Sequence, residues 1–83
     1  MVEEQEIGEI SNYFEKVGVA AIKLTAPLKV GDSIHIKGGE DTDFTQEVES
    51  MQINHENVEE AKKGDEVGLK VKEKVRKGYK VYK

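Results

Sequence analysis

The sequence predicts an all-β fold, which we expect to be a small, six-stranded, closed β-barrel. Its apolar residues are mostly β-branched and fall in short clusters separated by glycine-containing turns. No segment carries the longer apolar periodicity of an extended amphipathic helix. The 83 residues allow one domain over the whole chain. Closing the sheet would also remove the exposed edge strands that invite aggregation.

Six segments are expected to be strands. Val19 to Leu24 and Ser33 to Lys37 show the alternation with a period of two that a half-buried strand requires. The segment from Phe44 to Asn54 changes parity near Glu49 and Ser50, which predicts a β-bulge there. The other three strands are expected from about Glu6 to Phe14, from Glu66 to Lys74 and from Tyr79 to Tyr82.

The connections are expected to be turns, with one short helical piece. Lys29–Asp32, Lys62–Asp65 and Arg76–Tyr79 each place a glycine third in a group of four before a strand, which we interpret as repeated turn chemistry. Asn57 is followed by Glu60 and then by Gly64, a spacing typical of a capping box and a helix stop, so one helical turn is expected there. The acidic first five residues are expected to be flexible.

Charge divides the chain into two unlike parts. Residues 1–61 hold 14 acidic and 4 basic residues, a net charge of −10, whereas residues 62–83 carry +6, which leaves −4 overall. An acidic chain repels nucleic acid as a whole, but a local basic stripe can still bind it. On the expected fifth strand, alternation would direct one set of basic side chains to a single face: Lys70, Lys72, Lys74 and Arg76.

Several classes of site are not expected. The chain has no cysteine, which excludes disulfides and thiolate metal sites. Neither His35 nor His55 has ligands at metal-binding spacing, and the acidic loop at 40–43 lacks the calcium-loop pattern. A phosphate-binding glycine loop and a nucleophile motif are missing, so we expect no cofactor, no nucleotide and no catalytic residue.

The cellular location is expected to be cytoplasmic. A small, cysteine-free domain fits a reducing compartment. No apolar run approaches the roughly 20 residues that span a bilayer, and the acidic N-terminus is unlike the basic start of a signal peptide. We therefore expect no contact with a membrane.

Five motifs occur in order along the chain: Leu28-Lys29-Val30-Gly31-Asp32, Val48-x-Ser50, Asn54-His55-Glu56, Ala61-x-x-Gly64-Asp65-x-Val67-Gly68 and Val75-Arg76-x-Gly78. With them the chain resembles domain II of elongation factor Tu and its archaeal and eukaryal counterparts, from about Ile7 to Val81. It is especially similar to stand-alone, translation-factor-like copies of that barrel. Similar barrels also occur in other translation GTPases and end some large enzymes that are U32-type peptidases or RNA-modifying proteins. In this resemblance, the glutamate that helps hold the terminal adenosine of aminoacyl-tRNA aligns with Gln52.

The resemblance and the charge pattern together favour a binding module that is not an enzyme and is associated with translation or RNA. Its basic face would contact the backbone of tRNA or ribosomal RNA, and tyrosines would be available to stack on bases. The residues expected to bind RNA are Lys70, Lys72, Lys74, Arg76, Tyr79 and Gln52. A solvated outer face would explain the same lysines. The alternative function is a protein-interaction barrel that docks on a larger enzyme or translation factor, because the acidic first 61 residues favour a basic protein partner.

Overall fold

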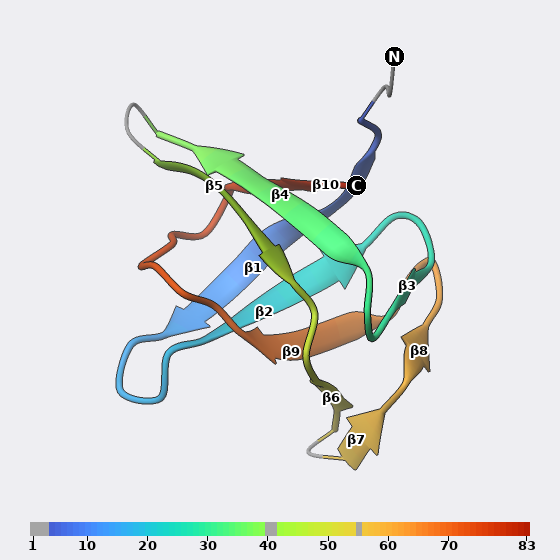
Figure 1. Cartoon of the computed structure of the whole chain (residues 1–83). Helices are drawn as coiled ribbons and strands as arrows, with labels where there is room; N and C mark the ends of the chain where they lie inside the picture. The colour runs from blue at the N-terminus through green and yellow to red at the C-terminus, as the bar shows by residue number, and fades with distance from the viewer. Residues whose placement is uncertain (1–3, 40–41, 55) are drawn as a thin grey trace.

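The computed structural model describes residues 4–39, 42–54 and 56–83. These residues form ten strands and no helix, so the all-β prediction is confirmed (Figure 1). The strands are β1 (Glu6–Phe14), β2 (Val19–Leu24), β3 (Leu28–Lys29), β4 (Ser33–Gly38), β5 (Thr42–Glu47), β6 (Met51–Ile53), β7 (Glu56–Val58), β8 (Glu60–Ala61), β9 (Glu66–Lys70) and β10 (Lys80–Tyr82).

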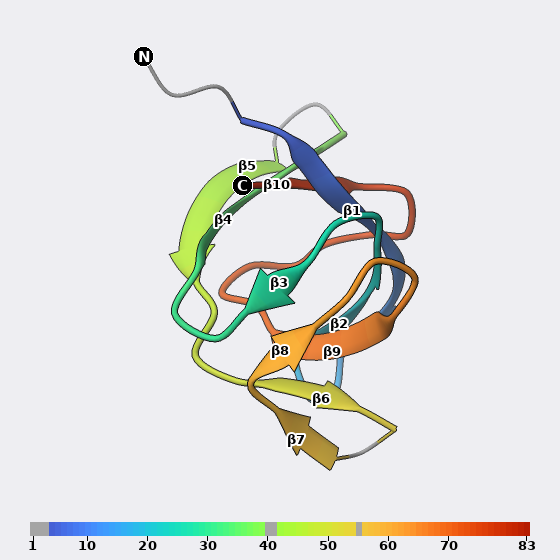
Figure 2. The ribbon, with the colours of Figure 1, turned by 90° about the vertical axis from the view of Figure 1, so that its right-hand side faces the viewer.

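Eight of the strands form one antiparallel sheet in the order β5-β4-β10-β1-β2-β9-β6-β7, and β3 pairs with β8 separately. The sheet wraps around one apolar core, as the turned view shows (Figure 2). The inward positions of β1, β2, β4, β9 and β10 supply its most buried side chains, namely Ile10, Ala20, Ile22, Ile36, Val67 and Val81. The alternation of β-branched residues therefore forms this core as expected.

The closed barrel is the part of the fold prediction that the structure does not support. In the described residues β5 and β7 are the end strands of the sheet, and no ladder joins them. Between β5 and the end of β9 the connection is made by a side chain instead. Gln46 Nε2 donates to the Lys70 carbonyl oxygen at 2.8 Å, and Gln46 Oε1 accepts from the Lys72 amide at 2.9 Å.

The long strand expected from Phe44 to Asn54 is divided into β5 and β6. Val48 and Met51 are both buried, whereas Glu49 and Ser50 between them are exposed. Two exposed residues in succession break the alternation of a strand, so the chain turns a corner there. The change of parity was therefore a correct signal, but it marks an end of pairing where a bulge was expected.

The predicted helical turn between Asn57 and Gly64 is wrong, because that segment contains β7 and β8. β7 pairs with β6 in a hairpin that contains Asn54 at a φ of 52°, and Ala61 of β8 lies buried opposite Leu28 of β3. A single helical turn has an unfavourable nucleus and no propagation to offset it. Pairing with two neighbouring strands gives the same backbone groups better partners.

The repeated turn chemistry is confirmed. Asp32 Oδ2 accepts from the Lys29 amide at 3.0 Å, and Asp65 Oδ2 accepts from the Lys62 amide at 2.9 Å. The glycine before each aspartate has a positive φ, which glycine adopts without strain. The third turn closes through a hydrogen bond from the Tyr79 amide to the Arg76 carbonyl at 3.2 Å. The three groups therefore act as strand initiators.

The first and last described segments lie side by side. Gln5 and Lys83 exchange two backbone hydrogen bonds of 3.1 and 2.9 Å, and Lys83 Nζ lies 2.8 Å from Asp32 Oδ2. Residues 1–3 of the N-terminus that was expected to be flexible lie outside the described residues. Across the described ranges, no helix is long and apolar enough to span a membrane.

Candidate docking surface

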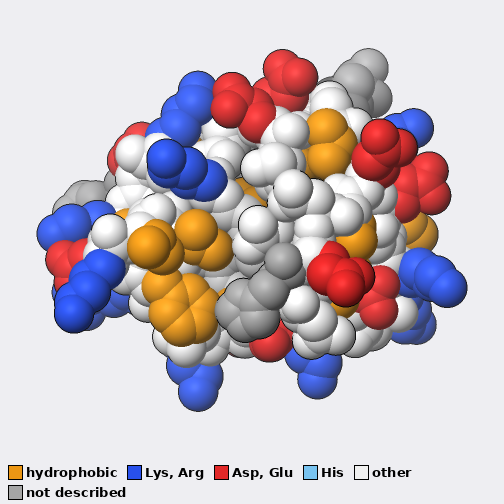
Figure 3. Space-filling view, turned by 90° about the horizontal axis from the view of Figure 1, so that it is seen from below, with side chains coloured by type: hydrophobic (Ala, Val, Ile, Leu, Met, Phe, Trp, Pro, Cys, Tyr) orange, Lys and Arg blue, Asp and Glu red, His pale blue; other side chains and the backbone are white. Residues whose placement is uncertain are grey.

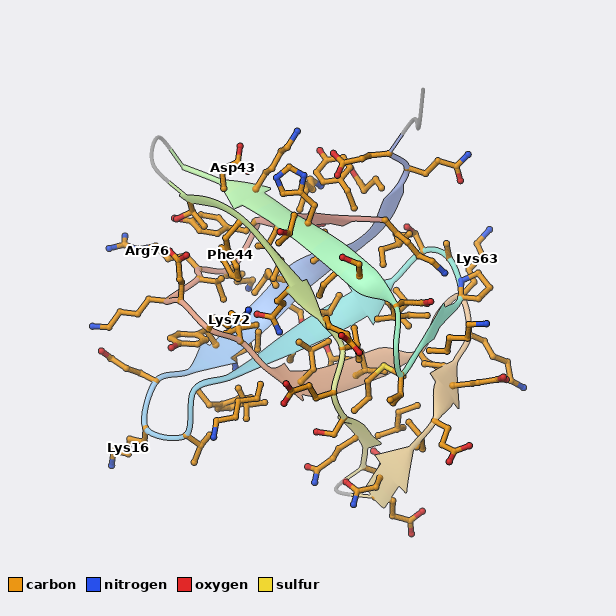
Figure 4. All side chains as sticks on the ribbon, in the orientation of Figure 1. Lys16, Asp43, Phe44, Lys63, Lys72 and Arg76 are labelled. Atoms are coloured by element: carbon orange, nitrogen blue, oxygen red, sulfur yellow. The ribbon has the colours of Figure 1, made fainter. Side chains whose placement is uncertain are left out.

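The four basic residues expected on one strand do not share one. β9 ends at Lys70, and the other three follow in an irregular segment before β10. All four side chains are exposed, and Arg76 points outward whereas Phe44 lies within the wrapped sheet (Figure 4). The stripe therefore lacks the pleated backbone that was expected to align it.

The irregular segment is held by its apolar residues and by an ion pair. Val71 and Val75 are buried and fix it against the core. Lys74 Nζ lies 3.0 Å from Glu15 Oε1, and the hydrogen bond to Glu15 raises the pKa of the Lys74 ammonium. Lys74 is thus already paired with an acid of the β1–β2 turn.

Tyr79 is a packing residue. Its ring covers Gly38, where an added Cβ would lie 2.1 Å from the ring carbons, and the side chain packs against the core. A base could stack on this ring only after the ring had left Gly38. No local pattern predicts this contact, because Gly38 and Tyr79 lie on different, non-consecutive segments.

A groove of about 780 Å³ lies on the outer face of β1, β2, β9 and β6. Strand register explains its shape. Asn12 pairs with Ala21, Ala21 with Gly68, and Gly68 with Gln52, so these four residues form one row across four strands. The floor is low in the middle because Ala21 has a single side-chain carbon and Gly68 has none. Gln52, expected to contact RNA, stands at one end of this row.

Exposed apolar side chains border the groove. Phe14 is 49% exposed and Val17 is 61% exposed. Both line the groove together with Val19 and Ile53. Seen from below, the molecule shows one group of hydrophobic side chains at the left, near Lys and Arg side chains, and further hydrophobic side chains at the right, among Asp and Glu (Figure 3). Exposed apolar side chains that border a groove make it a candidate for contact with another molecule.

The groove also carries acidic groups. Asp65 and Glu66 line it, and no lysine or arginine is among its lining residues. Ser11 Oγ donates to Glu66 Oε2 at 2.7 Å, which orients that carboxylate. Among the described residues neither acid forms an ion pair. The groove thus combines an apolar wall with two carboxylates, and Lys23 of β2 lies opposite Glu66 of β9 in the strand register.

A second polar cluster surrounds His35. Its Nδ1 lies 2.7 Å from Glu4 Oε2 and its Nε2 contacts the Asp43 carboxylate. The hydrogen bonds to Asp43 and Glu4 raise the pKa of His35. In the part of the chain that the structure describes, no group of three His, Cys, Asp or Glu residues could hold a metal ion. His55, which was not expected to bind a metal, lies outside that part, as do residues 40–41 of the acidic loop.

Sequence reasoning missed the groove. Its floor depends on the pairing of segments that are distant in the chain, so no local motif records it. One signal was available: Phe14 precedes the hairpin turn at residues 15–18 and Val17 lies within it, where exposed polar residues are the rule. Two large apolar residues at a hairpin tip indicate a surface that something covers.

The known proteins that are similar to this chain in sequence are named as a protease and a collagenase. The chain is 49% identical over 77 residues to an uncharacterized protease of Methanocaldococcus jannaschii, and 36% identical over 78 residues to a collagenase of Porphyromonas gingivalis. Each match covers 93% of this chain but only 19% and 22% of the relative, so the chain spans about a fifth of these proteins. No family model matches.

The solved structures that match this chain also come from a U32-type peptidase. The C-terminal domain of a Geobacillus thermoleovorans U32 peptidase superimposes with a TM-score of 0.90 at 22% identity, over 95% of this chain and 99% of that one. A second structure of that domain gives a TM-score of 0.85, also at 22% identity, over 90% of this chain and 86% of that one. These superpositions establish the fold.

These findings correct the resemblance to elongation factor domain II. The similar structures belong to a U32 peptidase, so a translation- or RNA-associated role is not supported. The prediction that the chain is not an enzyme is also contradicted, since the relatives are named protease and collagenase. The physical reason lies in the motifs: the two Gly-Asp groups cap turns before strands, so they report the fold and do not distinguish its functions.

Proposed function

We propose that this chain serves a U32-type peptidase as an accessory domain that docks on a larger protein. The observation that carries the proposal is the coverage of the matches. Nearly the whole chain aligns with about a fifth of each relative, and nearly the whole of a solved C-terminal peptidase domain aligns with it. A unit that occurs beside a much larger polypeptide needs a surface for that neighbour.

The surface chemistry supports a protein partner. The exposed Phe14 and Val17 favour contact with apolar protein surface. The net charge of −4 disfavours a phosphate backbone. A cytoplasmic location, expected from the cysteine-free sequence, remains part of the proposal.

The test uses the Methanocaldococcus jannaschii relative expressed without the segment that this chain matches. This remainder is mixed with the present chain or, as a positive control, with the relative's own segment, and complexes are measured by sedimentation velocity and calorimetry. We expect a one-to-one complex in both mixtures. If the relative's own segment binds and this chain does not, or if neither binds, the docking role is wrong.

A further inference from the structure

We propose that the groove over β1, β2, β9 and β6 is the docking site, and that it receives a segment of the larger protein in which an apolar side chain stands next to a lysine or arginine. This inference rests on the proposed function. It adds the surface and the chemistry of the partner segment.

Gly68 differs from the other glycines of the chain. Five of the eight glycines have a positive φ. Of the other three, a Cβ at Gly8 would lie 2.7 Å from Ile22 Cγ2, and one at Gly38 would lie 2.1 Å from the Tyr79 ring, so neither position has room for it. A Cβ at Gly68 would meet only Val19 Cγ1 at 3.4 Å, an ordinary van der Waals distance.

Gly68 is therefore required neither by backbone conformation nor by packing inside the chain. Glycine within a strand costs about 0.5–1 kcal/mol relative to alanine, because it loses more conformational freedom on folding. What it provides here is depth, since any side chain at this position would fill the middle of the groove. Glycine in a strand often marks the close approach of another molecule.

The shape of the groove suits a protruding side chain. Ala21 and Gly68 let a partner group reach the sheet, while Phe14 and Val19 border the depression with apolar surface. An apolar side chain seated there would be covered on several sides, which is the arrangement typical of binding hot spots. At the ends of the row, Asn12 Oδ1 accepts from the Tyr13 amide and Gln52 Nε2 donates to Asn57 Oδ1, so Asn12 Nδ2 and Gln52 Oε1 are the amide groups that can hydrogen bond with a partner backbone.

The charge of the groove favours a particular type of residue next to the apolar side chain of the partner segment. Among the described residues, the charged groups that line it are Asp65 and Glu66. The hydrogen bond from Ser11 holds the Glu66 carboxylate in place, which leaves its Oε1 free among the described residues. A lysine or arginine beside the apolar anchor would pair with these carboxylates, whereas an acidic segment would be repelled.

The experiment repeats the docking assay with two variants and a control. Gly68→Val fills the groove and Glu66→Gln removes one charge while it keeps an acceptor for Ser11. Glu49→Gln is the matched control, because Glu49 is exposed and lies beside the Gln46 bridge, away from the groove lining. We expect Gly68→Val to weaken docking by about tenfold or more, Glu66→Gln by about two- to fivefold, and the control to leave it unchanged.

A photo-crosslinking amino acid at Val17 identifies the occupant. We expect it to capture a segment of the larger protein with an apolar residue beside lysine or arginine. An acidic segment, or a second copy of this chain, would overturn the inference. So would equal docking of Gly68→Val and the native chain at retained thermal stability, although the docking role itself would then stand. Failure of the native chain to dock at all removes both proposals.

Discussion

The Gln46 side chain holds β5 against the end of β9, and its replacement by leucine tests whether this contact supports the fold. Gln46 is only 7% exposed and makes two hydrogen bonds of 2.8 and 2.9 Å to the backbone of Lys70 and Lys72. Leucine keeps a similar volume but can make neither bond. Each lost hydrogen bond costs about 0.5–1.5 kcal/mol, and more if the backbone group is left buried without a hydrogen-bond partner.

We therefore expect Gln46→Leu to lower the free energy of unfolding by about 2–3 kcal/mol. A domain of 83 residues has a total of about 4–12 kcal/mol, so the loss would be a large fraction. Urea unfolding followed by circular dichroism measures it as a lower midpoint at an unchanged slope. With a slope of about 1 kcal/mol per molar, the midpoint should fall by about 2–3 M.

The Gln46→Glu variant supplies a matched control for shape. Its ionised carboxylate can accept from the Lys72 amide but cannot donate to the Lys70 carbonyl, whereas the protonated acid can do both. The variant should therefore regain stability relative to the native chain as the pH falls and the acid protonates. If Gln46→Leu unfolds within about 0.5 kcal/mol of the native chain, the bridge contributes nothing and the reasoning fails.

Three further perturbations have defined outcomes. Gly38→Ala forces a Cβ into the Tyr79 ring and should lower the free energy of unfolding by about 1–3 kcal/mol, measured with urea. If the clash is the cause, Gly38→Ala should lower it much less in a chain that already carries Tyr79→Ala. Because its pKa is raised in the folded state, His35 contributes stability that is complete below its ordinary pKa of 6.5 and is lost as the pH rises through the folded-state pKa. The Tm of His35→Gln, measured across this pH range, should lack that loss, and the same dependence of Tm on pH in both proteins would contradict the role of His35. Asp32 holds both Lys83 and a turn amide, so chemical denaturation should rank Asp32→Ala below Asp32→Asn by about 1 kcal/mol, and equal stability would refute the role of the turn hydrogen bond.

Local alternation predicted the strands best where each strand has one buried face. β1 and β2 have the predicted bounds, and β4 runs one residue longer than expected. Prediction was poorer where the chain leaves the sheet. Lys72 and Lys74 continue the alternating pattern past Lys70, but the buried Val71 and Val75 anchor an irregular segment and no partner strand is present there. Alternation records which side chains are buried and does not record which backbone groups are paired.

The site could not be predicted for a related reason. Asn12, Ala21, Gln52 and Gly68 become neighbours only through the pairing of four strands. In the sequence, Ala21 and Gly68 read as weak strand positions and Gln52 reads as the counterpart of an RNA-binding glutamate. The turn motifs that led to that interpretation are strand initiators, which many functions can share.

Gly68→Val also makes a prediction about stability that does not depend on docking. Residue 68 lies in β9 between β2 and β6, its φ is not positive, and its only close neighbour would be Val19 at 3.4 Å. Valine suits a pleated, half-exposed position, and it reduces the freedom of the unfolded chain. The variant should therefore be more stable by about 1 kcal/mol, a rise in Tm of about 4–8 °C. A lower Tm would mean that the fold itself requires glycine at position 68, and Gly68 would then be no evidence for a groove that receives a partner.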